Sequence, residues 1–349
     1  MHGFGRLQIV FMNPNVGATP ATHSWFRRIV AFLLIVLVAI ALAGLIYENV
    51  SEARDRHANP MPGKLVDVAG KKMHINCMGE AGPTVILNSG LGDTYLSWTK
   101  VQPEIAKFAR VCSYDRAGLG YSDSSSQPRT SKVIAQELNA LLEAAQVPAP
   151  YVLVGHSMGG FDVRLYASLY RDQVAGMVLV DASHPDQENR LPAELKNLEG
   201  SALREEEFLE YTMPFGLPRL IGLCESDPAQ RAAECNFHTG RKIVAELKAV
   251  GESSAQTAAT PSLGDMPLVV LSHDPEKPSS EFAPDLAKPV NDAWEKMQEE
   301  MAHLSTRGAQ TIVKNSAHYI QIDQPQVVID AVQGVVQQQR QNASAVPRS

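Results

Sequence analysis

The stretch Tyr151-Val-Leu-Val-Gly-His-Ser-Met-Gly-Gly160 decides how the rest of the chain is interpreted. Residues 151–154 are apolar and partly β-branched, which is typical of a buried strand. Residues 155–159 fit G-x-S-x-G, in which the serine sits on a strained turn and its hydroxyl projects past the sheet edge. Residues 161–170 then place apolar side chains at helical spacing. This strand-turn-helix context makes Ser157 the candidate nucleophile, whereas a chance match would be a tight turn that only prefers small residues.

Length and composition limit the function classes. The 349 residues are enough for one large α/β domain or two ordinary ones. A net charge of −7, without a basic cluster, argues against nucleic acid as a partner. Four cysteines are too few for a disulfide scaffold, and they lack the paired C-x-x-C spacing of a zinc site. The sequence also contains no glycine-rich phosphate loop.

An apolar segment near the N-terminus is long enough to cross a membrane. Residues 29–46 carry no charge, and at about 1.5 Å per residue they span about 27 Å. Arg27 and Arg28 precede this segment, so the positive-inside rule favours residues 1–28 in the cytoplasm. We therefore predict a single-pass signal anchor, a linker over residues 47–63 and an extracytoplasmic domain. Two alternatives remain: a cleaved signal peptide of a secreted protein, because 41–43 resembles an A-x-A site, and a buried core helix.

Residues 64–340 alternate between strand-like and helix-like segments, which is typical of a mostly parallel sheet with helices on both faces. Residues from about 186 to 262 contain helical stretches but no clear strand, so we predict a helical cap between two strands. Residues 341–349 are predicted to be a disordered tail. The predicted strands are 64–68 and 72–77, which form a hairpin around Ala69-Gly70, then 84–87, 110–114, 151–154, 176–180, 268–272 and 310–313. The predicted helices outside the cap are about 98–109, 131–145, 161–170, 290–307 and 325–340.

A serine hydroxyl is a poor nucleophile unless a base takes its proton. His318 is the candidate base because it follows the last predicted strand in a loop of small residues, ahead of the final helix. His156 lies inside the elbow, so we expect it to line the site or to pack beneath it. Other histidines are interpreted as ordinary surface or core residues: His184, His238, His273 and His303.

The base needs a carboxylate to orient it, and two residues compete for this role. Asp181 ends the strand that follows the elbow helix, and Asp274 ends the next strand, beyond the cap. Both lie at the carboxyl ends of strands, where an open α/β sheet places its chemistry. We favour Asp181 because a well-defined apolar strand positions it, and we keep Asp274 as the alternative acid.

The oxyanion of an acyl-transfer reaction needs two backbone N–H donors. One is expected at Met158, directly after the nucleophile. The other is expected at Leu91, in the small-residue loop that follows the strand 84–87.

These motifs together resemble the α/β-hydrolase superfamily. They are Ser-Gly-Leu-Gly-Asp93, Tyr-Asp-Arg-Ala-Gly-Leu-Gly-Tyr-Ser122, Gly-His-Ser-Met-Gly159 and Ser-Ala-His318, in the order of the superfamily. The resemblance covers residues 64–340. It implies an eight-stranded sheet in the order 1-2-4-3-5-6-7-8 with strand 2 antiparallel, a helical cap after strand 6, a covalent acyl-enzyme and no cofactor.

Two positions depart from the commonest pattern of the superfamily. Ser89 stands where the first residue of the His-Gly oxyanion motif is expected, so the contacts that hold that loop can differ. An acid after strand 6 is a minority variant that resembles some haloalkane dehalogenases; those use Asp as the nucleophile, so Ser157 argues against dehalogenation. The implied strand order makes Cys77 and Cys112 neighbours, and Cys224 and Cys235 lie close in the cap sequence, so either pair could be bridged or all four could be thiols.

The resemblance implies a serine hydrolase that cleaves a carboxylic ester through Ser157, His318 and Asp181. The alternatives are a cofactor-free perhydrolase or acyltransferase with the same triad, and a non-catalytic binding protein on the same fold. The membrane anchor beside an apolar cap suggests a lipid-like ester. We expect the large apolar residues of the cap to form the cap's own core rather than an acyl pocket: Phe208, Tyr211, Met213, Phe215, Leu217, Leu220 and Leu223.

Overall fold

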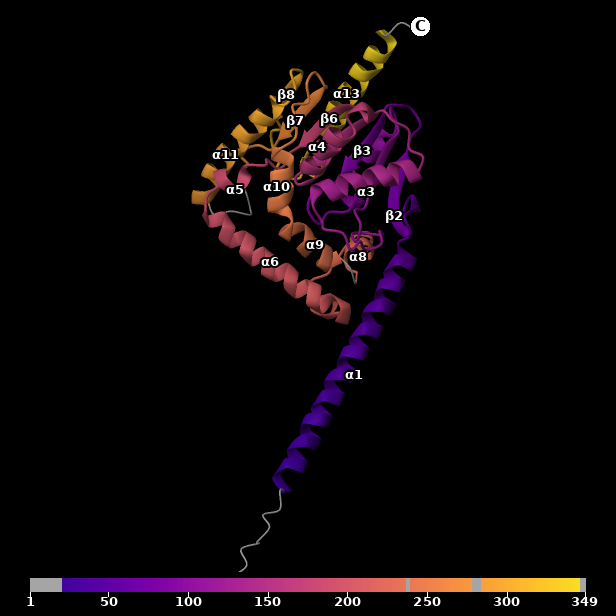
Figure 1. Ribbon diagram of the computed structural model, residues 1–349, viewed down its shortest axis with the longest axis vertical. Coiled ribbons are helices and arrows are strands. Elements are labelled where there is room, and N and C mark those ends of the chain that lie inside the picture. The colour runs from indigo at the N-terminus through magenta and orange to yellow at the C-terminus, as the bar shows by residue number, and fades with distance from the viewer. Residues whose placement is uncertain (1–20, 237–238, 278–283, 346–349) are drawn as a thin grey trace, which may run out of the picture.

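The protein is described by a computed structural model, which covers residues 21–236, 239–277 and 284–345. Its centre is an eight-stranded sheet in the order β1-β2-β4-β3-β5-β6-β7-β8, which confirms the predicted order (Figure 1). β2 pairs antiparallel with β1 and β4, also as predicted, and the remaining pairs are parallel. The strands are β1 (Lys64–Val68), β2 (Lys71–Met78), β3 (Thr84–Asn88), β4 (Val111–Tyr114), β5 (Tyr151–His156), β6 (Val174–Val180), β7 (Leu268–Ser272) and β8 (Gly308–Ile312).

Every residue of the central strands β3 and β5 is buried, because helices cover both faces of the sheet. One apolar cluster joins the first face of the sheet to α3 (Ser131–Ala144), α4 (Gly159–Leu169) and α11 (Pro284–Ala302). A second cluster joins the other face to α2 (Gln102–Ile105) and α13 (Pro325–Ala345). We call the eight strands and these five helices the sheet body.

The predicted helix over 98–109 is replaced by two short helices, the 3-10 helix η1 (Tyr95–Trp98) and α2. Pro103 lies in the first turn of α2, where its missing N–H is tolerated, but it cannot continue a helix that began earlier. The last helix also differs from the prediction. α13 continues to Ala345, so the first part of the predicted tail is helical, and residues 346–349 lie outside the described residues.

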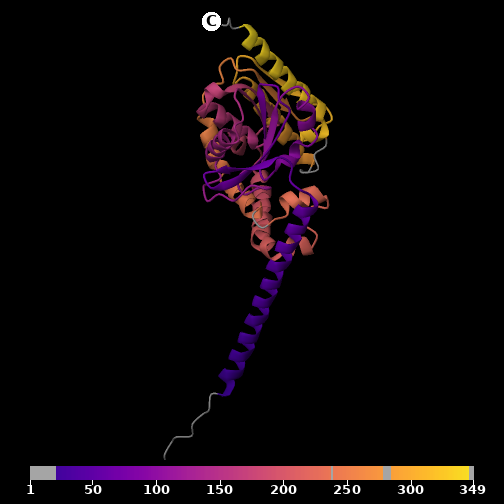
Figure 2. The same ribbon diagram turned by 90° about the vertical axis from the view of Figure 1, so that its right-hand side faces the viewer.

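α1 (Ala21–Ala58) is a single long helix that projects away from the rest of the molecule, on the side opposite the end of α13 (Figures 1 and 2). By length and composition this helix is a candidate membrane span. The segment predicted as a linker over 47–63 is therefore helical up to Ala58. Residues 48–58 contain two Glu, two Ala and two Arg, which favour helix, and the helix ends at Ala58 because Pro60 disfavours helical backbone at Asn59.

A group of helices between β6 and β7 forms the lid and coincides with the predicted cap. The large apolar side chains of the lid do not form the core that the sequence predicts. Of the seven residues predicted to form that core, only Met213 is buried, whereas Tyr211 is 71% and Leu220 64% exposed. The lid consists of α5 (Gln187–Arg190), α6 (Glu194–Thr212), η3 (Met213–Phe215), α7 (Leu217–Leu220), α8 (Pro228–Glu234), α9 (Thr239–Lys248) and α10 (Val250–Ala258).

Both cysteine pairs that the sequence left open are disulfides. Cys77 and Cys112 lie opposite each other on β2 and β4. Cys224 and Cys235 join the segment after α7 to the end of α8, within the lid.

Candidate active site

Ser157 lies in the turn between β5 and α4 with a φ of 52°, in the left-handed region that L-residues rarely adopt. Gly155 and Gly159, on either side of Ser157, are required because a side chain at either position would collide with neighbouring backbone. A Cβ at Gly155 would lie 2.6 Å from the Gly159 carbonyl oxygen, and a Cβ at Gly159 would lie 2.6 Å from the Asn88 carbonyl oxygen. The strand and the helix can therefore meet at this sharp turn only because both positions lack a side chain.

The loop after β8 brings His318 to Asp181, which directly follows β6. His318 Nδ1 lies 2.7 Å from Asp181 Oδ2, and the Asp181 side chain is fully buried. Asp181 itself has a φ of 43°, so its carboxylate leaves the end of β6 in an unusual direction. Of the two predicted acids, the structure brings Asp181 into contact with His318.

Asp181 accepts hydrogen bonds from several further donors. His273 contributes its backbone N–H and Nδ1, both at 3.0 Å, and Trp294 donates Nε1–H at 2.9 Å. Burial raises the pKa of a carboxyl group, but the hydrogen bonds from His273 and His318 outweigh it and hold the pKa of Asp181 below its ordinary value. Asp181 is therefore an anion, and it fixes the ring orientation of the histidines that it contacts.

Sequence reasoning missed His273 and Trp294. His273 was interpreted as an ordinary residue, although it follows the end of β7, where an α/β sheet places its chemistry. Its Nε2 lies 3.2 Å from Asn291 Oδ1, so both ring nitrogens are held. Trp294 comes from α11 and had no signal in the sequence.

Asp274 occupies a different environment. It accepts hydrogen bonds from the Asn315 backbone N–H at 3.0 Å and from Lys314 Nζ at 3.2 Å. The Asn315 amide lowers the pKa of Asp274. These contacts make Asp274 the cap of the loop that carries His318, rather than a partner of the imidazole.

His156 packs behind His318, as expected for a residue inside the elbow. It is fully buried, its ring centroid lies 4.7 Å from that of His318, and its Nε2 lies 3.1 Å from the His318 carbonyl oxygen. Burial lowers the pKa of His156, so the ring is neutral near pH 7. A neutral His156 that is protonated at Nε2 donates to this carbonyl and supports the His318 loop without adding a second positive charge.

The loop after β3 passes beside the nucleophile, since a Cβ at Gly90 would lie only 3.2 Å from Ser157 Cβ. Arg116 holds this loop by donating to the carbonyl oxygens of Ser89 at 2.7 Å and Gly90 at 2.5 Å. In a trans peptide the N–H points away from the preceding C=O, so the amides of Gly90 and Leu91 point away from Arg116. Among the described residues, the amides of Leu91 and Met158 have no hydrogen-bond acceptor.

Ser89, the departure from the usual motif, takes part in the same loop. Its hydroxyl donates to the Thr94 carbonyl at 2.8 Å and accepts from Trp98 Nε1 at 2.9 Å. The Ser89 side chain therefore fixes the loop from within.

A lid residue completes this arrangement. Glu246 of α9 pairs with Arg116 at 2.7 Å and accepts the Gly92 amide at 3.0 Å, and both charged side chains are buried. Burial opposes the charge of Arg116, but the Glu246 carboxylate raises its pKa above the ordinary value. Arg116 is therefore a cation that links the lid to the loop beside Ser157.

Within residues 21–236, 239–277 and 284–345, no cluster of three or more His, Cys, Asp or Glu side chains is arranged to hold a metal ion. What the described groups can do chemically is acid–base and nucleophilic work. They supply a serine on a strained turn, an imidazole on a buried carboxylate and free amides beside the serine.

Comparisons with known proteins agree with this fold. Residues 83–205 match a family model described as the alpha/beta hydrolase fold. A thermophilic esterase from Thermogutta terrifontis has a similar structure, with a TM-score of 0.56 and 22% identity over 80% of this chain and 98% of that one.

Two curated relatives are similar in sequence. The protein YqjL of Bacillus subtilis is 27% identical over 74% of this chain and 85% of its own length. A vacuolar membrane protein of Saccharomyces cerevisiae is 28% identical over 46% of this chain, which spans only 29% of the yeast protein. The strand order, the family model matched over residues 83–205 and the similar structures show that the chain has the α/β-hydrolase fold.

Proposed function

We propose that the protein is a membrane-anchored serine hydrolase that cleaves a carboxylic ester through Ser157, His318 and Asp181. The observation that carries the proposal is the 2.7 Å contact between His318 and the buried Asp181, combined with the strained turn at Ser157. The esterase of similar structure is compatible with it. α1 anchors the enzyme, and the catalytic domain lies outside the cytoplasm.

In the first half of the reaction, Ser157 Oγ attacks the ester carbonyl carbon while His318 Nε2 takes the serine proton. Asp181 stabilises the imidazolium that forms, because its carboxylate accepts from Nδ1–H. The amides of Leu91 and Met158 donate to the oxyanion. His318 then protonates the leaving alcohol, which gives an acyl-Ser157 intermediate.

In the second half, water enters in place of the alcohol. His318 takes one proton from the water, whose oxygen attacks the acyl carbon, and then returns the proton to Ser157 Oγ as the carboxylic acid leaves. A preorganised oxyanion site is expected to supply a large part of the rate, about 10²–10³-fold for each donor. An alcohol or hydrogen peroxide in place of this water would make the same site an acyltransferase or a perhydrolase.

The proposal is tested by covalent labelling with a fluorophosphonate. We expect the wild-type chain to be labelled, and Ser157→Ala and His318→Ala to lose labelling. Ser168→Ala is the control because Ser168 is an exposed serine of α4, the helix that follows Ser157, and it is expected to label like wild type.

Product analysis with a short p-nitrophenyl ester then separates the alternatives. Release of the carboxylic acid supports hydrolysis, whereas acyl transfer to added alcohol or peroxide supports the alternative acceptors. A folded wild-type chain that is neither labelled nor active on the short ester would contradict the proposal and favour a non-catalytic binding protein.

The proposed orientation is tested separately on intact cells that express a doubly tagged chain. We expect a C-terminal epitope to be accessible to added protease and an N-terminal epitope to be protected. The reverse pattern, or a chain that is released from the membrane by alkaline carbonate, would contradict it.

A further inference from the structure

One segment of the lid exposes several large apolar side chains together. We call residues 211–224 the lid tip; it comprises the end of α6, η3, α7 and the residues up to Cys224. Soluble surfaces seldom expose so many large apolar side chains next to one another. The exposed members are Tyr211 (71%), Phe215 (41%), Leu217 (37%), Leu220 (64%), Ile221 (55%) and Leu223 (53%).

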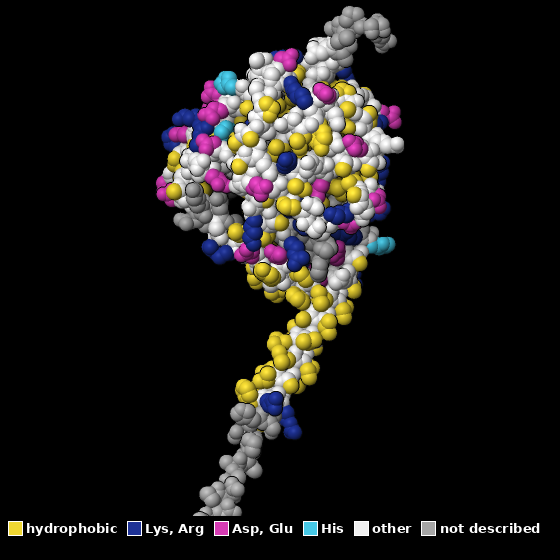
Figure 3. All heavy atoms as spheres, in the orientation of Figure 1, with side chains coloured by type: hydrophobic (Ala, Val, Ile, Leu, Met, Phe, Trp, Pro, Cys, Tyr) yellow, Lys and Arg dark blue, Asp and Glu magenta, His cyan; other side chains and the backbone are white. Residues whose placement is uncertain are grey.

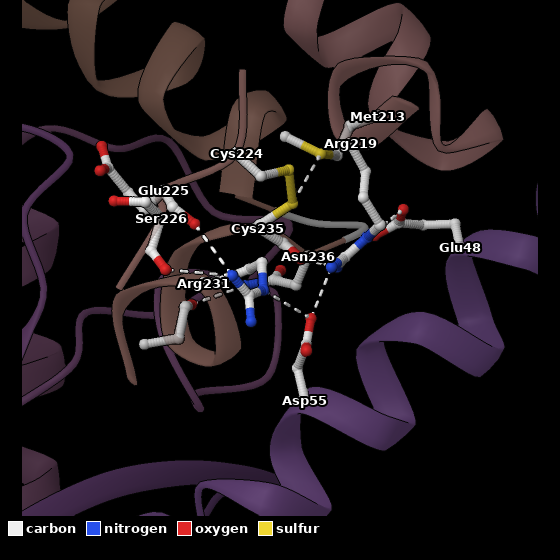
Figure 4. The surroundings of a disulfide bond; sticks show 11 residues. Glu48, Asp55, Met213, Arg219, Cys224, Glu225, Ser226, Arg231, Cys235 and Asn236 are labelled. Atoms are coloured by element: carbon white, nitrogen blue, oxygen red, sulfur yellow. Dashed lines mark hydrogen bonds and ion pairs between the residues drawn. A yellow bond between two sulfur atoms is a disulfide. The ribbon is translucent and has the colours of Figure 1, made fainter. Parts of the chain in front are cut away.

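The lid tip also carries a single charged residue, Arg219, whose side chain turns inward. Arg219 pairs with Glu48 at 3.1 Å and with Asp55 at 2.5 Å, both on α1 (Figure 4). The Glu48 side chain is fully buried in this contact. The outward surface of the lid tip is therefore left without a charge of its own.

The lid tip meets α1 at a defined level. A Cβ at Gly44 would lie 2.5 Å from the Phe215 carbonyl oxygen, and a Cβ at Gly216 would lie 2.7 Å from the Tyr47 ring. Gly44 precedes the end of the uncharged run at Ile46 by about 3 Å of helix. η3 therefore lies level with the last apolar turn of α1, where the membrane would end.

Aromatic side chains mark the same level. Trp25 (66% exposed) and Tyr47 (39% exposed) flank the uncharged run of α1 and are about 33 Å apart along the helix, slightly more than a hydrocarbon core of about 30 Å. Trp and Tyr are enriched at the two interfaces of a membrane. Tyr211, the most exposed of the large apolar side chains of the lid tip, adds a third such side chain at the Tyr47 end.

The lid tip is held in this position by covalent and polar contacts. The disulfide between Cys224 and Cys235 closes its far end, and Arg219 Nη2 donates to the Cys235 carbonyl at 3.0 Å (Figure 4). Arg231 of α8 approaches Asp55 of α1 at 3.4 Å. Because these contacts tie the lid tip to α1, its depth in a membrane is set by the helix.

We propose that the lid tip is a second membrane-contact surface, covered by the leaflet from which α1 emerges. Hydrophobic side chains continue from α1 onto the adjoining edge of the domain, so the two form one apolar surface (Figure 3). This continuity assigns the lipid leaflet as the occupant. Short apolar segments with interfacial aromatics bury their apolar side about 5–10 Å into the boundary of headgroups and acyl chains.

The contact has a consequence for the substrate, and this part rests on the proposed function. The lid that covers the catalytic loop through Glu246 is the same unit that enters the leaflet through its tip. An ester whose acyl chains reside in that leaflet is then presented beside the lid without leaving the membrane. The substrate class is a membrane-resident ester.

The surface is tested with the full chain in phosphatidylcholine nanodiscs that hold one chain each. Leu220→Cys carries an NBD fluorophore; the cysteines among the described residues are all bridged, so the new thiol is the one labelled. We expect blue-shifted NBD emission and strong quenching by a doxyl group placed near the lipid glycerol. Ile35→Cys, in the middle of the apolar run, is the control for insertion of α1 and should be quenched by a deep doxyl group.

Ile312→Cys is the control for an exposed apolar position outside the lid tip. Ile312 is 37% exposed on β8, and this strand lies on the side of the domain remote from α1 in Figure 1, so the probe should behave as in water. A Leu220 probe that behaves like the Ile312 probe would overturn the proposal. A blue shift without lipid quenching, seen only when several chains share a liposome, would overturn it in favour of a second copy of the chain.

A kinetic measurement tests the substrate class. Leu220→Glu with Ile221→Glu is expected to lower the rate on a bilayer-resident ester about tenfold, because it places charges in the interface, and to leave the rate on a short soluble ester unchanged. Ile312→Glu adds one negative charge on β8 and should change neither rate. Equal rates of the double variant and wild type on the bilayer ester would overturn the substrate class, whereas loss of activity on every ester in wild type would refute the proposed function and leave the quenching result standing.

Discussion

The sheet body buries apolar side chains in its interior. The lid instead exposes many of its apolar side chains, and it buries charged side chains where it contacts the body and α1. In the body, β3 and β5 are buried along their whole length between two apolar clusters. In the lid, Glu246 pairs with Arg116 of the body, and Arg219 pairs with Glu48 of α1. The matched family model ends at residue 205, inside α6.

This difference shows two ways in which a sequence specifies its structure: by a local apolar pattern, and by pairs of charged residues far apart in the chain. The hydrophobic effect acts on any apolar strand with the right pattern, so the body is encoded locally and recurs in relatives of low identity. A buried ion pair requires one particular partner, because either charge alone is costly to bury. The orientation of the lid therefore depends on a few contacts between segments far apart in the chain.

The largest effect is expected for the proposed catalytic residues, all of which follow strands of the sheet body. Asp181→Asn should lower kcat/KM on a short ester about 10⁴-fold, because the amide no longer holds the His318 tautomer that accepts the serine proton. Asp274→Asn is the matched control and should change kcat/KM by no more than a few-fold. Circular dichroism confirms that both variants fold, and an equal loss in both would contradict the assignment of the acid.

A smaller effect is expected where the lid meets α1. Arg219→Leu leaves the buried Glu48 carboxylate unpaired, which should destabilise the lid by about 3–5 kcal/mol. Hydrogen exchange measured by mass spectrometry on the full chain should rise in residues 213–235 and stay low in β5 and β6. Arg231→Leu, whose side chain is 29% exposed, should change stability by about 1 kcal/mol or less.

Uniformly faster exchange over the lid and the sheet in Arg219→Leu would break the comparison. It would mean that the lid and the body unfold as one unit, so that the ion pairs of the lid and the apolar core of the body do not stabilise separate parts of the molecule.

The smallest effect is a dependence on pH at a contact between the lid and the body. Glu234 of α8 accepts the Thr94 hydroxyl at 2.8 Å, and burial raises its pKa from 4.5 to about 7. A carboxyl group whose pKa is raised by folding favours the folded state below its ordinary pKa and loses that contribution as pH rises through the raised value. Glu234 should therefore stabilise the fold less at pH 8 than at pH 4.5.

Glu234→Gln removes this dependence, since an amide accepts from Thr94 without titrating. We expect its Tm to exceed that of wild type by about 2–4 °C at pH 8, with the difference shrinking toward pH 4.5. Glu188→Gln, which changes an exposed carboxylate of α5 in the same lid, is the control and should leave the dependence of Tm on pH unchanged. A constant Tm difference across this range would contradict a raised pKa at Glu234.

The parts predicted from sequence were those with a local pattern. The strand order followed from alternating apolar segments and the resemblance that they supported, and Ser157 followed from its pentapeptide. The choice between Asp181 and Asp274 stayed open because both end a strand, and what distinguishes them is a backbone angle at Asp181 that no sequence pattern marks. His273 and Trp294 lie 92 and 113 positions from Asp181, so their shared contact exists only in the fold.

The exposed lid tip was predicted wrongly for a related reason. Its apolar residues have the composition of a core, and composition does not say whether protein or another apolar medium covers them. The contact between Arg219 and Glu48 joins residues 171 positions apart, so no local sequence pattern could predict that the lid tip lies next to α1.

The pairing of Arg116 with Glu246 restricts how the lid can move. Arg116 fixes the carbonyl oxygens of Ser89 and Gly90, and Glu246 of the lid fixes Arg116. A lid that swung outward would separate the two charges and leave each of them stranded, which costs several kcal/mol, so such a conformation is sparsely populated. An open lid would also release the loop beside Ser157, so this single ion pair couples the position of the lid to the geometry of that loop.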